Sequence, residues 1–209
     1  PSPRPDKSEF DIDRIGVKAS QFSFARLQNA DPVLGVDMSS TGEVGCLGDD
    51  LNEALLNSLI ATGYRLPEAG SAILISSGAA KGKVSLLEPA KELVKKGYEV
   101  YATGGTAKFF NDNGVKATPV AWPDEDTAPD GSAVENVMDM IAQHRFALIV
   151  NVPKNHTKRE LTNGYRIRRG AIDHNIPLIT NARLATAFIE AFCAVGVDGL
   201  KIKSWQEYV

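Results

Sequence analysis

Residues 98–107 read Tyr-Glu-Val-Tyr-Ala-Thr-Gly-Gly-Thr-Ala, an apolar run followed by two glycines and a helix-like start. This order predicts a buried strand, a tight turn and a helix. Thr103, Thr106 and the exposed amides of the helix would then form a pocket for phosphate or carboxylate. An ordinary turn capped by Thr106 explains the pattern equally well. Dinucleotide binding is disfavoured, because the third glycine of that fingerprint is absent.

The same alternation of strand and helix continues on both sides of this stretch. Strand-like apolar runs occupy residues 72–76, 98–103, 116–122, 146–152 and 177–181. Helices are predicted at residues 86–96, 106–113, 133–144, 166–174 and 183–195. The order predicts an α/β domain with a Rossmann-like three-layer arrangement and a mostly parallel sheet. Ligands of such domains bind beyond the carboxyl ends of the strands.

Residues 1–66 form a less complete unit. Prolines in the first five residues predict an extended arm. The elements expected after it are a strand at 15–24, a strand and turn within 33–44, and a helix from Asp49 or Asp50 to Gly63. Because an independent domain typically needs ~100 residues, we expect the rest of this unit upstream. The chain therefore divides into an incomplete segment, 1–66, and an α/β domain, 67–209.

Composition and charge exclude several classes of function. The chain has 209 residues, 43% hydrophobic, with a formal net charge of −3, which predicts a soluble protein without nucleic acid or membrane as a partner. No apolar run approaches the ~20 residues of a membrane span, and the start does not resemble a signal peptide. Cys46 and Cys193 lie in apolar surroundings, which favours buried thiols in a reducing compartment. We expect a cytoplasmic protein, unless a targeting segment preceded residue 1.

Further polar residues follow the predicted strands and would meet at the same edge of the sheet. Asn151 and Lys154 begin a loop whose amide and ammonium groups can bind carboxylates or carbonyls. Lys83 follows the first strand of the domain, and Trp122 ends a strand where its ring can stack on a ligand. The alternatives are a polar surface loop, a solvated lysine and a half-buried core tryptophan.

Catalytic and metal-binding motifs are not recognisable. The three histidines lack cysteine or carboxylate neighbours at metal-ligand spacing, and neither cysteine lies in a nucleophile motif. We therefore predict no catalytic residue, metal ligand or cofactor in this chain. Arg166, Arg168 and Arg169 can receive an anion or a partner carboxylate, but most surface arginines on a helix only cover apolar surface.

Several motifs together resemble one enzyme family. Gly16-Val17-Lys18, Asp31-Pro32-Val33-Leu34-Gly35 and Ser40-Thr41-Gly42-Glu43-Val44 resemble the end of the second ATP-grasp domain of carbamoyl-phosphate synthase large subunits. Ala102-Thr103-Gly104-Gly105-Thr106-Ala107 and Ile167-Arg168-Arg169-Gly170-Ala171 resemble the family's methylglyoxal-synthase-like domain, which binds allosteric effectors. The resemblance implies that residues 1–66 are the C-terminal remnant of the ATP-grasp domain and that residues 67–209 bind an effector.

The resemblance also implies the setting of the chain in a larger protein. The parent enzyme would use ATP and Mg or Mn to form carbamoyl phosphate for arginine, urea or pyrimidine synthesis. Its nucleotide- and metal-binding residues lie upstream, so this chain would be non-catalytic. The implied partners are the rest of the large subunit and a glutaminase small subunit, and an animal ammonia-dependent enzyme would be mitochondrial. We expect the helix at 51–60 and the linker at 64–67 to transmit the signal.

The identity of the effector follows from finer resemblances. Pro119-Val120-Ala121-Trp122-Pro123 and the Asn-x-Pro at Asn151 resemble members activated by N-acetyl-L-glutamate. The resemblance implies an effector site of Thr103, Thr106, Trp122, Asn151 and Asn163, to which we add Lys83 and Lys154 as candidates at the same edge of the sheet. Lys154 stands where those members tend to have asparagine, and Gly104-Gly105 replaces a Glu-Ala pair. Members controlled by UMP and IMP carry a hydroxyl-rich Asn-Thr-Thr-Ser-Gly loop that this chain lacks. We favour N-acetyl-L-glutamate or a similar acidic metabolite, with UMP or IMP as the alternative.

Three alternatives from other classes remain. Methylglyoxal synthase, a phosphate lyase, shares the fold, but Glu160 lies near where its catalytic histidine should be. The cyclohydrolase domain of the bifunctional purine enzyme has a similar Ser-Gly-Gly-Thr-Ala turn, but its Gly-Gly-Arg-Val-Lys-Thr-Leu-His-Pro run is missing. A structural interaction module is the last alternative.

Overall fold

The computed structural model describes residues 14–34, 40–125, 127, 133–153, 158–196, 198–201, 203, 204 and 207, with the backbone alone at 158–161. Its strands are β1 (Ile15–Gln21), β2 (Gly42–Gly48), β3 (Ala72–Ser77), β4 (Glu99–Thr103), β5 (Ala117–Val120), β6 (Phe146–Val152) and β7 (Leu178–Ile179). Its helices are α1 (Leu51–Ala61), α2 (Ala80–Ser85), α3 (Leu87–Lys95), α4 (Gly104–Asp112), α5 (Val137–Ala142), α6 (Lys158–Asp173) and α7 (Ala182–Val195), with a short 3-10 helix, η1 (Phe24–Arg26).

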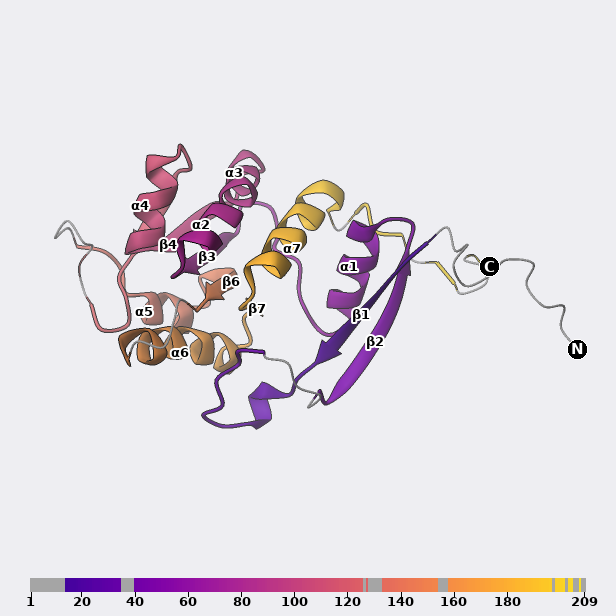
Figure 1. The fold of residues 1–209 in the computed structure, drawn as a ribbon, viewed down its shortest axis with the longest axis horizontal. Helices are drawn as coiled ribbons and strands as arrows, with labels where there is room; N and C mark the ends of the chain where they lie inside the picture. Colours follow the sequence, from indigo (N-terminus) through magenta and orange to yellow (C-terminus); the bar gives the residue numbers. More distant parts are fainter. Residues whose placement is uncertain are drawn as a thin grey trace, which may run out of the picture.

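Five parallel strands form the central sheet, in the order β5-β4-β3-β6-β7. The side chains of β3 alternate between its two faces, as the period of a strand requires. Ile73 and Ile75 join a core with residues of α3, α4 and α7, whereas Leu74 joins a core with residues of α5 and α6. These helices lie on opposite sides of the sheet in Figure 1. The predicted fold class, an α/β domain with three layers and a parallel sheet, is confirmed.

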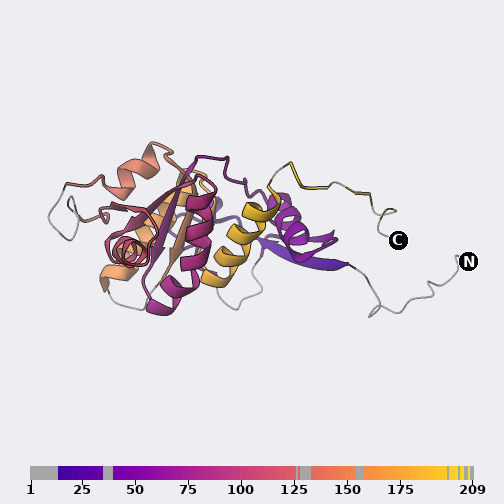
Figure 2. The ribbon, with the colours of Figure 1, turned by 90° about the horizontal axis from the view of Figure 1, so that it is seen from above.

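The N-terminal part packs onto this domain through α1. β1 and β2 form a separate two-stranded antiparallel sheet. α1 begins after Asp50, whose carboxylate accepts a hydrogen bond of 2.9 Å from the amide of Glu53. Leu55, Leu56 and Leu59 of α1 belong to the same core as α7, and Figure 2 shows α1 and α7 side by side. The hydrophobic core therefore crosses the boundary that we placed at residue 66.

The structure differs from the predicted elements mainly at their ends. α6 begins at Lys158, eight residues before the predicted start at 166. The sequence does not predict this start, because the first turns of the helix are polar and show no apolar periodicity. α2 was not predicted, and its glycine has a steric role, since a Cβ at Gly82 would lie 2.4 Å from Ser77 Oγ. The strand predicted at 15–24 ends at Gln21, and the one predicted at 177–181 contains only two residues. None of the described helices is both long and apolar enough to cross a membrane.

Candidate functional site at the carboxyl edge of the sheet

The carboxyl ends of β3, β4 and β6 bring polar residues together at one edge. Ser76 of β3 pairs in register with Asn151 of β6, and Thr103 ends the neighbouring strand β4. All three side chains are almost fully buried. The hydroxyls of Ser76 and Thr103 are hydrogen-bonded at 2.9 Å. One hydroxyl hydrogen makes that bond, so the pair retains a second hydrogen for an acceptor.

The helix α4 starts directly at this edge. Its N-cap is Thr103, and the Thr103 side chain makes no capping bond to the helix. The helix N-terminus therefore offers backbone amides and the positive end of the helix dipole. Gly104 and Gly105 are already helical, and neither has a positive φ. The expectation that they form a separate tight turn is wrong, because the helix begins two residues earlier than predicted.

Thr106 has a structural role that differs from the predicted cap. Its hydroxyl accepts a hydrogen bond from the amide of Ser77 and donates one to the Ser77 carbonyl, both at 3.1 Å. Thr106 is 2% exposed, so these bonds lie in the interior, where an unpaired backbone group is costly. The side chain thus fixes α4 to the end of β3. The Ser77 hydroxyl itself is buried and has no hydrogen-bond partner among the described residues.

Lys83 brings a positive charge to the first turn of α4. It lies on α2, and its ammonium group donates a hydrogen bond of 3.0 Å to the carbonyl of Gly105. A Cβ at Gly105 would lie 3.3 Å from the Lys83 nitrogen, so a glycine suits this close approach. Lys83, Thr103 and Thr106 therefore lie around the α4 N-terminus.

On the other side of the edge, Arg168 orients the side-chain amide of Asn151. The Arg168 guanidinium donates a hydrogen bond of 2.9 Å to Asn151 Oδ1. Because a guanidinium only donates, the oxygen of the amide must face Arg168, and the NH₂ group must point the other way. Arg168 is 2% exposed, so its description as a surface arginine is wrong; the alternative, a partner carboxylate, is correct and is supplied by Asp31.

Trp122 and Asn163 lie where the loop after β5 meets α6. The amide of Asn163 donates a hydrogen bond of 2.5 Å to Asp124, and the guanidinium of Arg166 donates one of 3.1 Å to the carbonyl of Pro123. Trp122 is half-buried against the core formed with α5 and α6. This position fits both the stacking and the core interpretation of Trp122. Lys154 and the side chain of Glu160 lie outside the described residues.

A separate open cavity of about 480 Å³ lies away from these residues. Its walls come from residues 20–26, from the linker around Tyr64, and from residues 175–181 near β7. None of the described candidate site residues lines it. Size alone would favour this cavity as a ligand site. The chemistry favours the carboxyl edge, because the buried hydroxyls, the amide and the ammonium group converge there.

The described cysteines and acidic residues are scattered and show no grouping typical of a metal site. Cys193 is buried, and burial raises the pKa of its thiol to about 11. Cys46 is only half-buried, and burial also raises its pKa. The expectation of buried thiols thus holds for Cys193 more fully than for Cys46. Within the described part of the chain, no three His, Cys, Asp or Glu residues are grouped as metal ligands would be.

Comparisons with known proteins identify the family to which the chain belongs. Residues 85–180 match the family model of the MGS-like domain, so the chain contains a domain of that class. It is 43% identical over 190 residues to the multifunctional protein CAD of Squalus acanthias, covering 87% of this chain. It is 37% identical over 179 residues to the mitochondrial carbamoyl-phosphate synthase [ammonia] of Homo sapiens, covering 86% of this chain. A methylglyoxal synthase from Elizabethkingia anophelis NUHP1 aligns over 68% of this chain and 91% of its own, with 15% identity and a TM-score of 0.39.

The chain is thus an MGS-like domain with its N-terminal extension, related to the C-terminal region of carbamoyl-phosphate synthases and CAD-type multifunctional proteins. The resemblance to carbamoyl-phosphate synthases and to their MGS-like domain is confirmed, whereas the assignment of residues 1–66 to an ATP-grasp domain stays a prediction. The chain spans 8% of the length of the Squalus protein and 12% of the human one. Its relatives therefore carry this region as a small part of much larger proteins.

Proposed function

We propose that the carboxyl edge binds an acidic effector and that the chain is the regulatory region of a carbamoyl-phosphate synthase large subunit. The orientation of Asn151 carries this proposal, since Arg168 leaves its NH₂ group as a donor toward the edge. The α4 amides and the Lys83 ammonium group add further donors and positive charge. Such a site suits a ligand rich in carboxylate or carbonyl oxygens.

N-acetyl-L-glutamate fits this description best. It has two carboxylates for the positive groups and an acetamide carbonyl for the Asn151 amide. The threonine hydroxyls contribute less than expected, because Thr106 is fully engaged with Ser77 and Thr103 shares its bond with Ser76. A phosphate group, which prefers many hydroxyl and amide donors, therefore finds fewer partners here.

The proposal extends to the parent protein. The parent would form carbamoyl phosphate with ATP and Mg or Mn bound upstream of this chain, and would work with the rest of the large subunit and with a glutaminase subunit. Residues 1–66 would be the end of an ATP-grasp domain. An effector would change the activity of the parent only by binding one of its conformations more tightly, with a coupling free energy of ~1–3 kcal/mol.

Calorimetric titration of this chain with N-acetyl-L-glutamate, UMP, IMP and ornithine tests the proposal. We expect N-acetyl-L-glutamate to bind, and N-acetyl-L-glutamine, which lacks the side-chain carboxylate, to bind at least about tenfold more weakly, since a lost charged hydrogen bond costs ~1.5–3 kcal/mol. UMP binding alone would reject the acidic metabolite in favour of a nucleotide. Absence of heat with every ligand would contradict an effector site in this chain.

A further inference from the structure

Arg168 connects the candidate site to a distant part of the sequence. Its Nη1 atom donates to Asn151, while Nε and Nη2 donate to the two carboxylate oxygens of Asp31, at 2.7 and 2.5 Å. Asp31 precedes Arg168 by 137 residues and belongs to the segment 24–34 between β1 and β2. This two-pronged geometry fixes both partners relative to the planar guanidinium.

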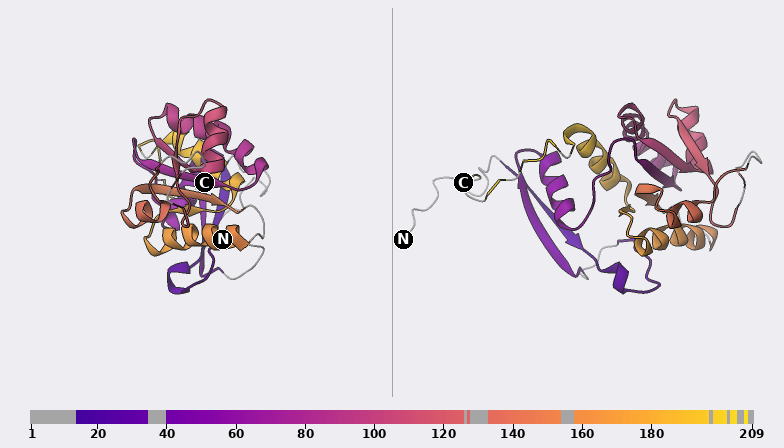
Figure 3. Two further views of the ribbon diagram at one scale, coloured as in Figure 1. Left: turned by 90° about the vertical axis from the view of Figure 1, so that its left-hand side faces the viewer. Right: turned by 180° about the vertical axis from the view of Figure 1, so that it is seen from behind.

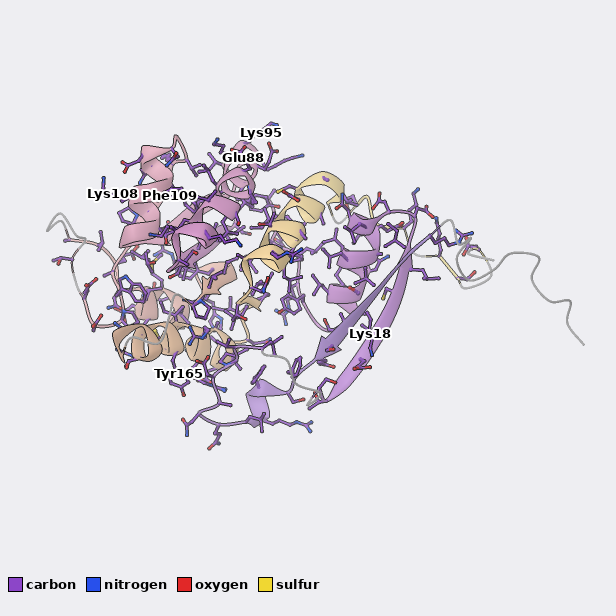
Figure 4. The ribbon with its side chains drawn as sticks, in the orientation of Figure 1. Lys18, Glu88, Lys95, Lys108, Phe109 and Tyr165 are labelled. Carbon is purple, nitrogen blue, oxygen red and sulfur yellow. The ribbon has the colours of Figure 1, made fainter. Side chains whose placement is uncertain are left out.

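Neighbouring residues of α6 fasten the same segment. The Arg169 guanidinium donates to the carbonyls of Phe24 and Leu27, at 3.1 and 3.0 Å, and the Tyr165 hydroxyl donates to the carbonyl of Asn29 at 3.2 Å. Figure 3 shows the segment with η1 beside one end of α6, and Figure 4 shows Tyr165 on that helix. Most of these bonds hold the backbone, so the segment depends on α6 for its position.

Among these residues of α6, Arg168 contacts both the segment, at Asp31, and the edge of the sheet, at Asn151. Its charge is buried, and a buried cation needs all of its partners. A Cβ at Gly164 would lie 2.8 Å from Arg168 Nη1, so the helix leaves little room for another position of this group. A change in the hydrogen bonding of Asn151 is therefore transmitted to Arg168, and from there to Asp31.

We propose that Arg168 is a positioning residue that couples ligand binding at the carboxyl edge to the docking of the segment 24–34. This inference builds on the proposed function, because it takes the edge as the ligand site. A ligand that accepts from the Asn151 NH₂ group holds the amide oxygen toward Arg168, and thereby favours the Arg168–Asp31 contact. By reciprocity, the docked segment strengthens ligand binding.

Two variants test separately the contact of Arg168 with Asp31 and the donor group of Asn151. In Asp31→Asn the segment loses its charged contact while Asn151 is intact, so we expect N-acetyl-L-glutamate to bind about fivefold or more weakly. In Asn151→Asp the oxygen toward Arg168 is kept but the donor is lost, so ligand binding falls while the segment stays docked. Asp112→Asn is the matched control, because Asp112 pairs with the exposed Lys108 on α4 and contacts neither Asp31 nor Asn151.

Hydrogen exchange provides a readout that needs no ligand. In Asn151→Ala, the amides of Leu27 and Ala30, which bond within the segment, should exchange about tenfold faster, although Asn151 does not contact them. Asn151→Asp and Asp112→Asn should leave their exchange unchanged. Arg168→Lys, which keeps the charge without the fork, should behave like Asn151→Ala.

The outcomes distinguish this inference from the proposed function. If wild type binds the effector, but Asp31→Asn binds it equally well and Asn151→Ala leaves the exchange of the segment unchanged, the coupling is refuted while the site stands. If wild type binds no effector, the regulatory coupling fails with the proposed function. Faster exchange in Asn151→Ala would still show the structural link through Arg168.

Discussion

At the scale of single residues, the important side chains are those whose partners lie far away in the sequence. Thr106 and Arg168 both belong to motifs of the sequence, which predict a helix cap or an effector contact for Thr106 and an anion, a partner carboxylate or apolar surface for Arg168. Their actual partners, Ser77 and Asp31, lie on other elements, 29 and 137 residues away. No periodicity or spacing encodes such pairs. The sequence therefore places candidate site residues at strand ends, but it does not show the hydrogen bonds that position them.

The hydrogen bonds between Thr106 and Ser77 can be tested directly by substitution. Replacement by valine leaves the buried amide and carbonyl of Ser77 without their partner, so we expect Thr106→Val to lower the free energy of unfolding by ~1–3 kcal/mol. Thr106→Ser keeps the hydroxyl, so it should lower the free energy of unfolding by less than Thr106→Val does. Thr118→Val, at an exposed position of β5, is the control. Urea denaturation measures all three; equal stability of the two valine variants would contradict the role of Thr106.

Asp173 gives a residue-scale prediction about pH. The Arg169 guanidinium lowers its pKa below the ordinary 3.8, so the pair stabilises the fold above that value and the stabilisation is lost as pH falls through the folded pKa. Because the carboxylate is 54% exposed, we expect Asp173→Asn to cost at most ~1 kcal/mol at pH 7. Urea denaturation at pH 7 and near pH 2.5 should show that the difference in the free energy of unfolding between wild type and Asp173→Asn becomes smaller at the lower pH. A difference that does not depend on pH would contradict the role of the Asp173 carboxylate.

At the scale of elements, the strands were predicted better than the helices that carry the site. β3, β4 and β6 each contain a mostly apolar run because both faces of the sheet are covered, and such runs are visible in the sequence. The start of α6 was missed because polar residues dominate its first turns, and α2 because it is short. The edge could therefore be located from the strand ends, while the positions of Lys83 and Arg168 on it depended on helices whose extent was unknown.

The helix α1 and the linker after it are coupled to the main domain, as the expected route of the signal requires. The Tyr64 hydroxyl donates a hydrogen bond of 2.6 Å to the carbonyl of Leu178 in β7. The route itself stays a prediction. The contacts of Arg168 and Arg169 add the segment 24–34 as a second connection between the N-terminal part and the sheet.

The buried face of α1 makes this coupling measurable. Leu56 is fully buried in the core shared with α7, so Leu56→Ala should lower the free energy of unfolding of the chain by ~2–5 kcal/mol in one cooperative transition. Leu51→Ala, 52% exposed on the same helix, should change it by less than ~0.5 kcal/mol. Two separate transitions in chemical denaturation would instead show that residues 1–66 unfold independently.

At the scale of the whole molecule, the chain combines a common three-layer fold with its own set of polar residues at the carboxyl edge of the sheet. The three-layer domain follows from the alternation of strand and helix, and the family match confirms it. The fold alone does not select a ligand. In the proposed function, Lys83, Asn151 and the α4 N-terminus make this selection, because they would present donors and positive charge to an acidic molecule. The open cavity near β7 is the competing location.

The most direct test of the account locates the ligand on the structure. In ¹⁵N-labelled protein titrated with N-acetyl-L-glutamate, we predict the largest NMR shift changes at the amides of residues 104–106 and at the side-chain NH₂ of Asn151. Smaller changes should appear in the segment 24–34. Changes confined to residues 20–26 and 175–181, around the separate cavity, or no changes at all, would contradict an effector site at the carboxyl edge of the sheet.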